Sequence, residues 1–196
     1  MPAHEEERWR VFVAIDVPDP VREALKEPLT ALDPLRESLR LNAVERMHLT
    51  LHFLGHLPYG EVEKLPAALA PVVSGHRRFR LAAQGVGAFP GIDRPRVVWA
   101  GVAGVDLPRL VELQRELGDG LRRAGVTVED RFHAHLTLAR ARRPLRAPER
   151  SAVRDWSARW EPASFGDVPV DQVRLMRSQL GGGPARYTTL TTFDLQ

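Results

Sequence analysis

The stretch His48-Leu49-Thr50-Leu51 occurs a second time, without change, at His135-Leu136-Thr137-Leu138. Polar and apolar residues alternate in both copies, as they do on a β-strand with one buried face. We therefore expect the histidine and threonine of each copy to share one strand face, while the leucines point into a core. Two such strands on opposite sides of a groove would place two imidazoles and two hydroxyls around one small ligand.

The pattern of predicted strands and helices before each copy also repeats. An apolar strand is expected at 11–15 in the first half and at 97–100 in the second half. Between strand and motif, both halves have apolar residues at helical spacing, over 19–32 and over 106–125. Pro28 should kink or end the first of these helices early. The chain is thus predicted to contain two strand–helix–strand units, each ending in a histidine strand and related by pseudo-two-fold symmetry.

The remaining sequence favours antiparallel pairing. Further strands are expected at 79–88, 97–102, 170–180 and 186–195, and further helices at 61–73 and 148–160. The last two strands are predicted to form a hairpin around the glycine-rich turn at 181–184. Hairpins indicate an α+β fold rather than a doubly wound parallel sheet. We expect a bilobal architecture, with two pseudo-symmetric lobes of antiparallel sheet and helix around a central cleft.

Length and composition are typical of one soluble domain. The chain has 196 residues and no cysteine, so it can bury a full core and has no disulfide or thiolate chemistry. Residues 1–9 are polar and acidic, unlike a signal peptide, and no apolar run reaches the ~20 residues of a membrane span. We expect a cytoplasmic monomer without membrane contact, folded as a single two-lobed domain over 1–196.

The positive charge is carried almost entirely by arginine. The net charge is only +3, and Lys26 and Lys64 are the only lysines. A GC-rich genome would explain this bias without any function, but arginine also binds phosphate through two hydrogen bonds at once. Of the two arginine clusters, at 77–80 and 140–146, the second begins five residues after a motif histidine. A solvated surface is the ordinary interpretation of either cluster, but the position of the second one favours phosphate contact.

A metal centre is one interpretation of clustered histidines, because imidazole is a common zinc ligand. The zinc-protease signature needs a glutamate directly after its first histidine, where this chain has Leu49. On the histidine face, no cysteine or carboxylate lies close in sequence to either motif. We therefore expect neither a metal nor another cofactor.

Acid–base chemistry at a phosphodiester suits two facing imidazoles better. Histidine titrates near neutrality, so one imidazole can take a proton from the nucleophile while the other protonates the leaving oxygen. Hydroxyl groups and a guanidinium can hold the phosphate oxygens on which negative charge grows. A serine triad is not indicated, because the Gly-x-Ser-x-Gly elbow is absent, and the glycines at 181–183 lack the lysine of a P-loop.

Two further histidines lie near the motifs. His133 precedes His135 by two residues, so both would share one strand face about 6.7 Å apart, and His133 is a candidate to line the pocket. His52 nominally shares the face of His48, but four strand residues span about 13 Å. His52 therefore cannot share one small site with His48, and we expect it to be structural, with a position at the rim of the groove as the alternative.

The two motifs resemble those of the two-histidine phosphoesterase superfamily, which is marked by paired His-x-Thr-x sequences. Within it, the chain is similar to the bacterial and archaeal RNA 2′,3′-cyclic phosphodiesterases of the 2′-5′ RNA ligase family. The similarity covers nearly the whole chain and is carried by the stretches 10–15, 47–55, 131–140 and 175–187. It implies a bilobal α+β fold and metal-free hydrolysis of 2′,3′-cyclic phosphate ends of RNA to 2′-phosphates. Some relatives also join tRNA halves through a 2′-5′ linkage, without a nucleotide cofactor.

The resemblance also implies roles for individual residues. His48 would be the acid toward the departing 3′-oxygen, and His135 the base toward water. Thr50 and Thr137 would bind the phosphate, which Arg140 would also neutralise. The expected partner is accordingly RNA with 2′,3′-cyclic phosphate ends, including tRNA halves.

The resemblance also implies a role for Phe53, and this role depends on the geometry of the strand. Phe53 follows His48 at the offset at which Arg140 follows His135, and it would stack on a base. In an ideal strand an offset of five places both residues on the face opposite the histidines, so these roles require a bulge, a twist or a strand end. A core position for Phe53 is the alternative.

The sequence leaves other functions open. The same chemistry could act on a small cyclic-phosphate nucleotide or on a 2′-5′ oligonucleotide, because the motifs contact only the phosphate. A non-catalytic RNA-binding module would use the arginine-rich surface, although it would need no paired histidines.

Overall fold

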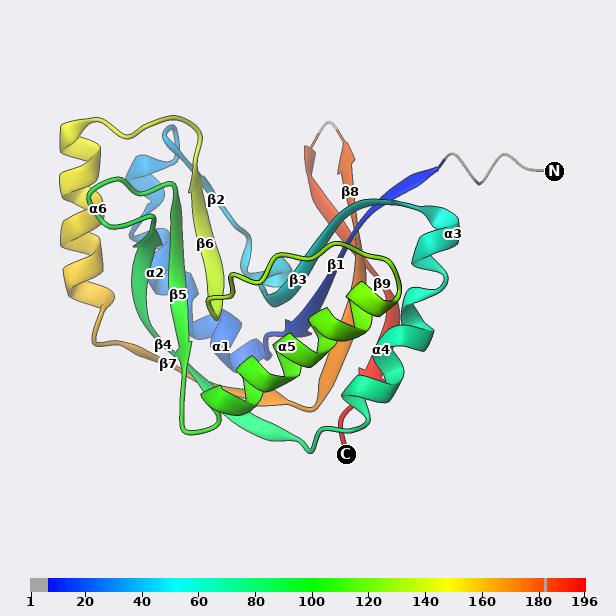
Figure 1. Cartoon of the computed structure of the whole chain (residues 1–196). Helices are drawn as coiled ribbons and strands as arrows, with labels where there is room; N and C mark the ends of the chain where they lie inside the picture. Colours follow the sequence, from blue (N-terminus) through cyan, green and yellow to red (C-terminus); the bar gives the residue numbers. More distant parts are fainter. Residues whose placement is uncertain (1–6, 182) are drawn as a thin grey trace.

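The computed structural model describes residues 7–181 and 183–196, which form one curled antiparallel sheet with helices packed against it (Figure 1). The strands are β1 (Arg8–Asp16), β2 (Leu39–Leu41), β3 (His48–Pro58), β4 (Phe79–Phe89), β5 (Val97–Ala103), β6 (His135–Ala141), β7 (Ser164–Val170), β8 (Gln172–Gly181) and β9 (Gly183–Asp194). The α-helices are α1 (Asp19–Ala24), α2 (Lys26–Thr30), α3 (Tyr59–Val62), α4 (Leu65–Val73), α5 (Leu107–Arg123) and α6 (Ala147–Trp160), and short 3₁₀ turns cover Asp33–Leu35 and Val44–Arg46.

The order of the strands confirms the predicted pseudosymmetry. The sheet runs β7-β4-β5-β6-β3-β1-β8-β9, and β2 also pairs with β6. The half β6-β5-β4-β7 therefore repeats the order of the half β3-β1-β8-β9. The two histidine strands, β3 and β6, meet in the middle through the antiparallel pair Leu49–Leu136. The fold is α+β with two sheet-and-helix halves, as expected.

The first helix of each half packs against the other half. The helix α1 follows β1 but packs against β7, while α5 follows β5 but packs against α4 and β3. Figure 1 shows α5 lying across the middle of the molecule and pointing toward α4. The sequence predicted the two strand–helix–strand units correctly, but the exchange of helices is a feature of the tertiary structure.

Prolines account for the places where the helices differ from the prediction. The first helix breaks at Leu25, not at Pro28, which lies instead in the first turn of α2. A proline is tolerated there because the first N–H groups of a helix have no partner within the helix. The predicted helix 61–73 is divided in the same way, with Pro66 in the first turn of α4. The hairpin of β8 and β9 is confirmed, although Gly182 of its turn lies outside the described residues.

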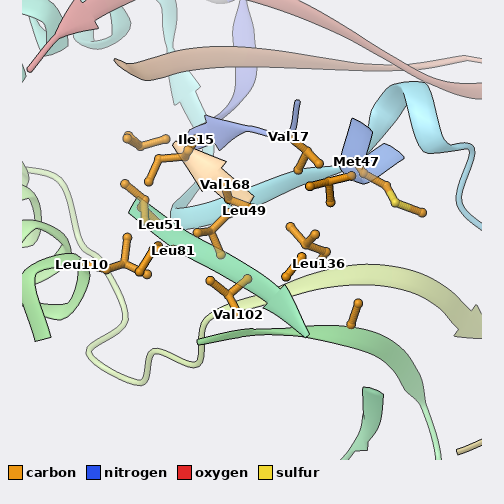
Figure 2. Close-up of a cluster of buried hydrophobic side chains, with 14 of the residues drawn as sticks. Ile15, Val17, Met47, Leu49, Leu51, Leu81, Val102, Leu110, Leu136 and Val168 are labelled. Carbon is orange, nitrogen blue, oxygen red and sulfur yellow. The ribbon is translucent and has the colours of Figure 1, made fainter. Parts of the chain in front are cut away.

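The core lies on the side of the sheet away from the motif histidines. Leu49, Leu51, Leu136 and Leu138 are all buried, as their alternation predicted. Figure 2 shows Leu49 and Leu136 together with core residues from several other strands and from α5. The two halves therefore share one core, which holds β3 and β6 against each other. Within the described residues, no helix is long and apolar enough to cross a membrane.

Candidate active site

A β-bulge lies at the last residue of the motif in both histidine strands. The pairing of β1 with β3 shifts so that Leu51 has no partner, and the pairing of β5 with β6 shifts in the same way at Leu138. Because an extra residue reverses the alternation of side chains, the last residue of each motif and the residue after it both point into the core. Phe53 and Arg140 consequently lie on the same face as the motif histidines. This is the irregularity that their predicted roles require.

The same bulge shows that His52 does not share the face of His48, as an unbroken strand would require. His52 lies on the core side of β3 and is only 4% exposed, although it still borders the pocket described below. Its Nε2 lies 2.7 Å from the backbone oxygen of Gln114 in α5, and Gly118 leaves room for the ring. Burial lowers the pKa of His52, which favours the neutral imidazole. We interpret His52 as a packing residue that connects β3 to α5.

Both motif histidines are held by the same hydrogen bond. His48 donates from Nδ1 to the backbone oxygen of Arg46 at 2.9 Å, and His135 donates from Nδ1 to the backbone oxygen of His133 at 2.7 Å. A carbonyl oxygen can only accept, so Nδ1 carries the hydrogen in each ring. The neutral imidazole therefore has its lone pair on Nε2, the atom that can accept or return a proton.

Neighbouring aromatic rings hold the two imidazoles in place. The ring of His48 stacks on Phe12, with centroids 4.7 Å apart, and meets the edge of Tyr187 at 5.2 Å. The ring of His135 meets Phe89 edge-to-face at 5.1 Å. Such contacts restrict ring rotation, so each Nε2 keeps one direction. Catalytic groups need this kind of preorganisation.

His133 lies near His135, as the spacing predicts. It precedes β6 rather than belonging to it, and its ring centroid lies 6.3 Å from that of His135. Phe89 also packs against it, at 5.0 Å. Its backbone oxygen orients His135, while its side chain lines the same pocket.

A pocket of about 630 Å³ opens between the two histidine strands. A volume of that order accommodates a ligand the size of a nucleotide. Thr50 and Phe53 line it on the β3 side, and His133 and His135 line it on the β6 side. His48, Thr137 and Arg140 are not among its lining residues, although His48 and Thr137 are each two residues from one that is. More of β3, at Leu51, His52, Leu54 and Gly55, also borders the pocket. The sequence did not indicate the opposite wall, which comes from residues of the segment 127–132 between α5 and β6.

The charges around the two imidazoles differ. Burial lowers the pKa of both His48 and His135. The charge of Asp16, which lies opposite His48 in the pairing of β1 with β3, raises the pKa of His48. The side-chain charges that act on His135 come from His133 and Arg140, and both lower its pKa. Arg140 and His135 lower the pKa of His48 as well, so the carboxylate of Asp16 offsets only part of the effect of burial on this ring.

Arginines converge on the same region. Desolvation lowers the pKa of Arg140, and the charges of Arg40 and Arg10 lower it further. Arg40 lies opposite Arg140 in the pairing of β2 with β6. Guanidinium groups this close repel one another, so an anion between them would be stabilised. Sequence reasoning identified Arg140 but not Arg10, Arg40 or Asp16, because no local pattern connects those three positions to the motifs.

The described residues contain no cluster of three or more histidine, aspartate or glutamate side chains that could hold a metal ion. The carboxylate of Asp16 is instead bound by Arg22 at 2.6 Å and by Arg174 at 2.9 Å. The groups that the site does bring together are imidazoles, hydroxyls and guanidinium groups. These groups can transfer protons and bind an anion.

Comparison with known proteins agrees with this fold and identifies the family. The family model of the 2'-5' RNA ligase superfamily matches residues 13–182, so the chain belongs to this superfamily. A protein of Archaeoglobus fulgidus named RNA 2',3'-cyclic phosphodiesterase is 33% identical and aligns over 94% of this chain and 99% of its own length. A protein of the same name from Thermus thermophilus is 35% identical, over 95% and 90% respectively.

Solved structures show the same similarity. The crystal structure of TT0787 of Thermus thermophilus superposes with a TM-score of 0.77 at 30% identity, covering 94% of this chain and 97% of that one. The structure of E. coli LigT complexed with 3'-AMP superposes with a TM-score of 0.74 at 28% identity, covering 96% and 99%. The arrangement of the sheet is therefore shared over nearly the whole chain.

Proposed function

We propose that this protein hydrolyses the 2′,3′-cyclic phosphate ends of RNA to 2′-phosphates by two-histidine acid–base catalysis. The observation that carries the proposal is the pair of imidazoles held in one tautomer by equivalent hydrogen bonds on adjacent strands. Relatives that align over nearly their full length are named for this activity. LigT of E. coli has been crystallised with a nucleoside monophosphate, which supports a nucleotide end as the ligand of this pocket.

The geometry suggests how the reaction proceeds. His135 would accept a proton at Nε2 from water as the water oxygen forms a bond to phosphorus. The bond from phosphorus to the 3′-oxygen then breaks, and His48 gives its Nε2 proton to that oxygen. Water and leaving group lie on opposite sides of the phosphorus, as two separate imidazoles require. The phosphate remains on the 2′-oxygen. Attack by a 5′-hydroxyl of a second RNA, in place of water, would form a 2′-5′ linkage.

The other residues on this face would bind the substrate. The hydroxyls of Thr50 and Thr137 can donate to the non-bridging oxygens, on which charge increases in the transition state. Arg140 adds a fixed positive charge. Phe53 lines the pocket and is 49% exposed. The guanidinium of Arg10 lies over its ring at 4.8 Å, so a base that stacks on this face would take the place of that group. His133 would complete the pocket wall next to the base catalyst.

Product analysis tests the proposal directly. A short RNA with a 2′,3′-cyclic phosphate end should yield an end with a 2′-phosphate, detected by chromatography against standards of both phosphate isomers. A 3′-phosphate product would contradict the assignment of the leaving oxygen. An unchanged RNA would contradict the activity and would favour a module that binds RNA without catalysis.

We expect hydrolysis to continue in the presence of EDTA. The two imidazoles provide both proton transfers and the arginines provide the positive charge, so the proposed steps need no bound metal. The measurement is the initial rate after dialysis against chelator, compared with the untreated protein. Loss of the rate with EDTA, followed by its return with zinc or manganese, would show that the mechanism depends on a metal.

Replacement of Thr50 or Thr137 by alanine should reduce kcat/KM by about 10- to 100-fold. Each change removes one hydrogen bond to a charged oxygen, which is worth about 1.5–3 kcal/mol. Thr50→Ser and Thr137→Ser keep the hydroxyl and should retain most of the activity. If serine is as damaging as alanine at either position, the threonine acts through its methyl group rather than through a hydrogen bond.

Asp16→Asn should lower the pKa of His48. The negative charge of Asp16 raises that pKa, so its removal should let His48 lose its proton at lower pH. The alkaline limb of the profile of kcat/KM against pH should then move to lower pH, because the acid must be protonated. NMR titration of the imidazole protons identifies which ring has changed, since a rate profile alone reports the coupled pair. A shift confined to His135 would contradict the proposed electrostatic difference.

A further inference from the structure

A second cavity, of about 350 Å³, lies beyond the ends of the strands that carry His135 and its neighbours. Its lining comes from two loops, between β4 and β5 and between β6 and α6, and from the first turn of α6: Pro90, Arg94, Pro95, Arg96, Pro144, Leu145 and Arg150. We call this cavity the arginine pocket. Figure 1 shows the loop between β4 and β5 reaching toward α6. Prolines restrict the backbone of both loops, so the cavity is shaped before a ligand binds.

The positive charge of this cavity is not neutralised by neighbouring carboxylates. Arg94 and Arg96 are exposed, and within the described residues their guanidinium groups form no hydrogen bond or ion pair. The nearby Asp93 is bound by Arg154 at 3.0 Å. Glu149 is bound by Arg143 at 2.6 Å. The arginine pocket therefore offers an anion two guanidinium groups that no carboxylate of the described residues already binds.

Residues of the arginine pocket are joined through the backbone to residues that contact or adjoin the active site. Phe89 contacts the ring of His135, and the next residue along the chain, Pro90, lines the arginine pocket. Just before β5, the backbone oxygen of Arg96 accepts a hydrogen bond from the N–H of Ala141, one residue after Arg140. An RNA whose cyclic end is bound near His135 would thus have the positively charged side chains from Arg140 to Arg96 near its upstream nucleotides.

We propose that the arginine pocket binds a backbone phosphate of the RNA upstream of its cyclic end. This inference rests on the proposed function and specifies its substrate: an RNA chain would contact both cavities, whereas a mononucleotide fills only the first one. Arginine suits this contact because its planar fork matches phosphate oxygens. Such contacts carry no base preference, which fits an enzyme that acts on ends of differing sequence.

The test compares substrates of different length on matched variants. The test variant is Arg94→Ala/Arg96→Ala. The control is Arg77→Ala/Arg80→Ala, which removes the same charge at the opposite end of β4, roughly 30 Å away; the ion pair of Arg80 with Asp167 is exposed and contributes little. Substrates are a 2′,3′-cyclic mononucleotide and RNA oligonucleotides of increasing length with the same cyclic end.

For the test variant we expect an unchanged kcat/KM on the mononucleotide and a loss of about 10-fold on the longer oligonucleotides. The slope of log kcat/KM against log salt should become shallower by about 0.7 for each lost phosphate contact with single-stranded RNA. The control should match the wild-type protein on every substrate. An equal loss on mononucleotide and oligonucleotide, an equal loss in the control, or no loss at all would each overturn the inference.

A binding measurement separates this inference from the proposed function. Fluorescence anisotropy with an RNA that ends in a 2′-phosphate reports affinity without any reaction. If the wild-type protein hydrolyses no cyclic phosphate, the proposed function fails, and the anisotropy still decides whether Arg94 and Arg96 bind RNA. Equal affinity of the test variant and the wild-type protein would refute the arginine pocket as an RNA site.

Discussion

Replacing His48 or His135 by alanine will lower kcat for hydrolysis of a 2′,3′-cyclic phosphate end by about 10²–10⁴, the usual contribution of one general acid or base. Neither ring belongs to the buried core, and each is held by a backbone oxygen and neighbouring aromatic rings. The fold should therefore be retained, as checked by circular dichroism and thermal unfolding. The double variant should lose much less than the product of the two single losses, because the two residues act as a unit.

Two other histidines provide the controls for this experiment. His133→Ala removes a side chain from the pocket wall but keeps the backbone oxygen that orients His135, so its loss should be smaller. His52→Ala should reduce stability and have little direct effect on kcat, because this ring is buried against α5. If His133→Ala abolishes turnover while His135→Ala retains it, the base has been assigned to the wrong residue of the pair.

Leu136→Ala will reduce the free energy of unfolding by about 2–5 kcal/mol, the range observed for buried leucines. Leu136 has no exposed surface and lies opposite Leu49, where β6 meets β3. A cavity here would weaken the contact that joins the two halves of the sheet (Figure 2). Because the two motif histidines flank this contact, kcat should fall as well, even though Leu136 does not touch the substrate.

Urea unfolding monitored by tryptophan fluorescence measures this effect. Leu136→Met keeps most of the volume and should cost less than about 1.5 kcal/mol. A loss in Leu136→Ala no larger than in Leu136→Met would mean that the junction is held elsewhere. A full loss of stability with unchanged kcat would mean that the two strands stay aligned without this side chain.

Much of the fold was predictable because its signals are local. The alternation in the two motifs predicted buried leucines on both histidine strands, and all four are buried. The leucines of α5 recur at helical spacing and predicted the helix to within a few residues. The hairpin of β8 and β9 followed from its glycine-rich turn. In each case neighbouring residues carry the whole pattern, so no knowledge of distant contacts is needed.

Where the prediction failed, the deciding contacts are distant in sequence. His52 was expected on the face of His48 because an unbroken strand has a period of two. The bulge at Leu51 depends on how β3 pairs with β1, and the pairing partner is far away along the chain. The same bulge, with its counterpart in β6, places Phe53 and Arg140 on the histidine face. A strand by itself contains no signal for a shift in register.

The sequence by itself determined the two halves of the molecule, the buried face of each histidine strand and the identity of the chemical groups. Only the tertiary structure decided that α1 and α5 each pack on the opposite half, that Asp16 lies opposite His48, and that the arginine pocket forms beside the active site. The physical reason is the range of the interactions. Side-chain periodicity is set by backbone geometry over a few residues, whereas register, helix exchange and converging charges are set by packing between segments far apart in the chain.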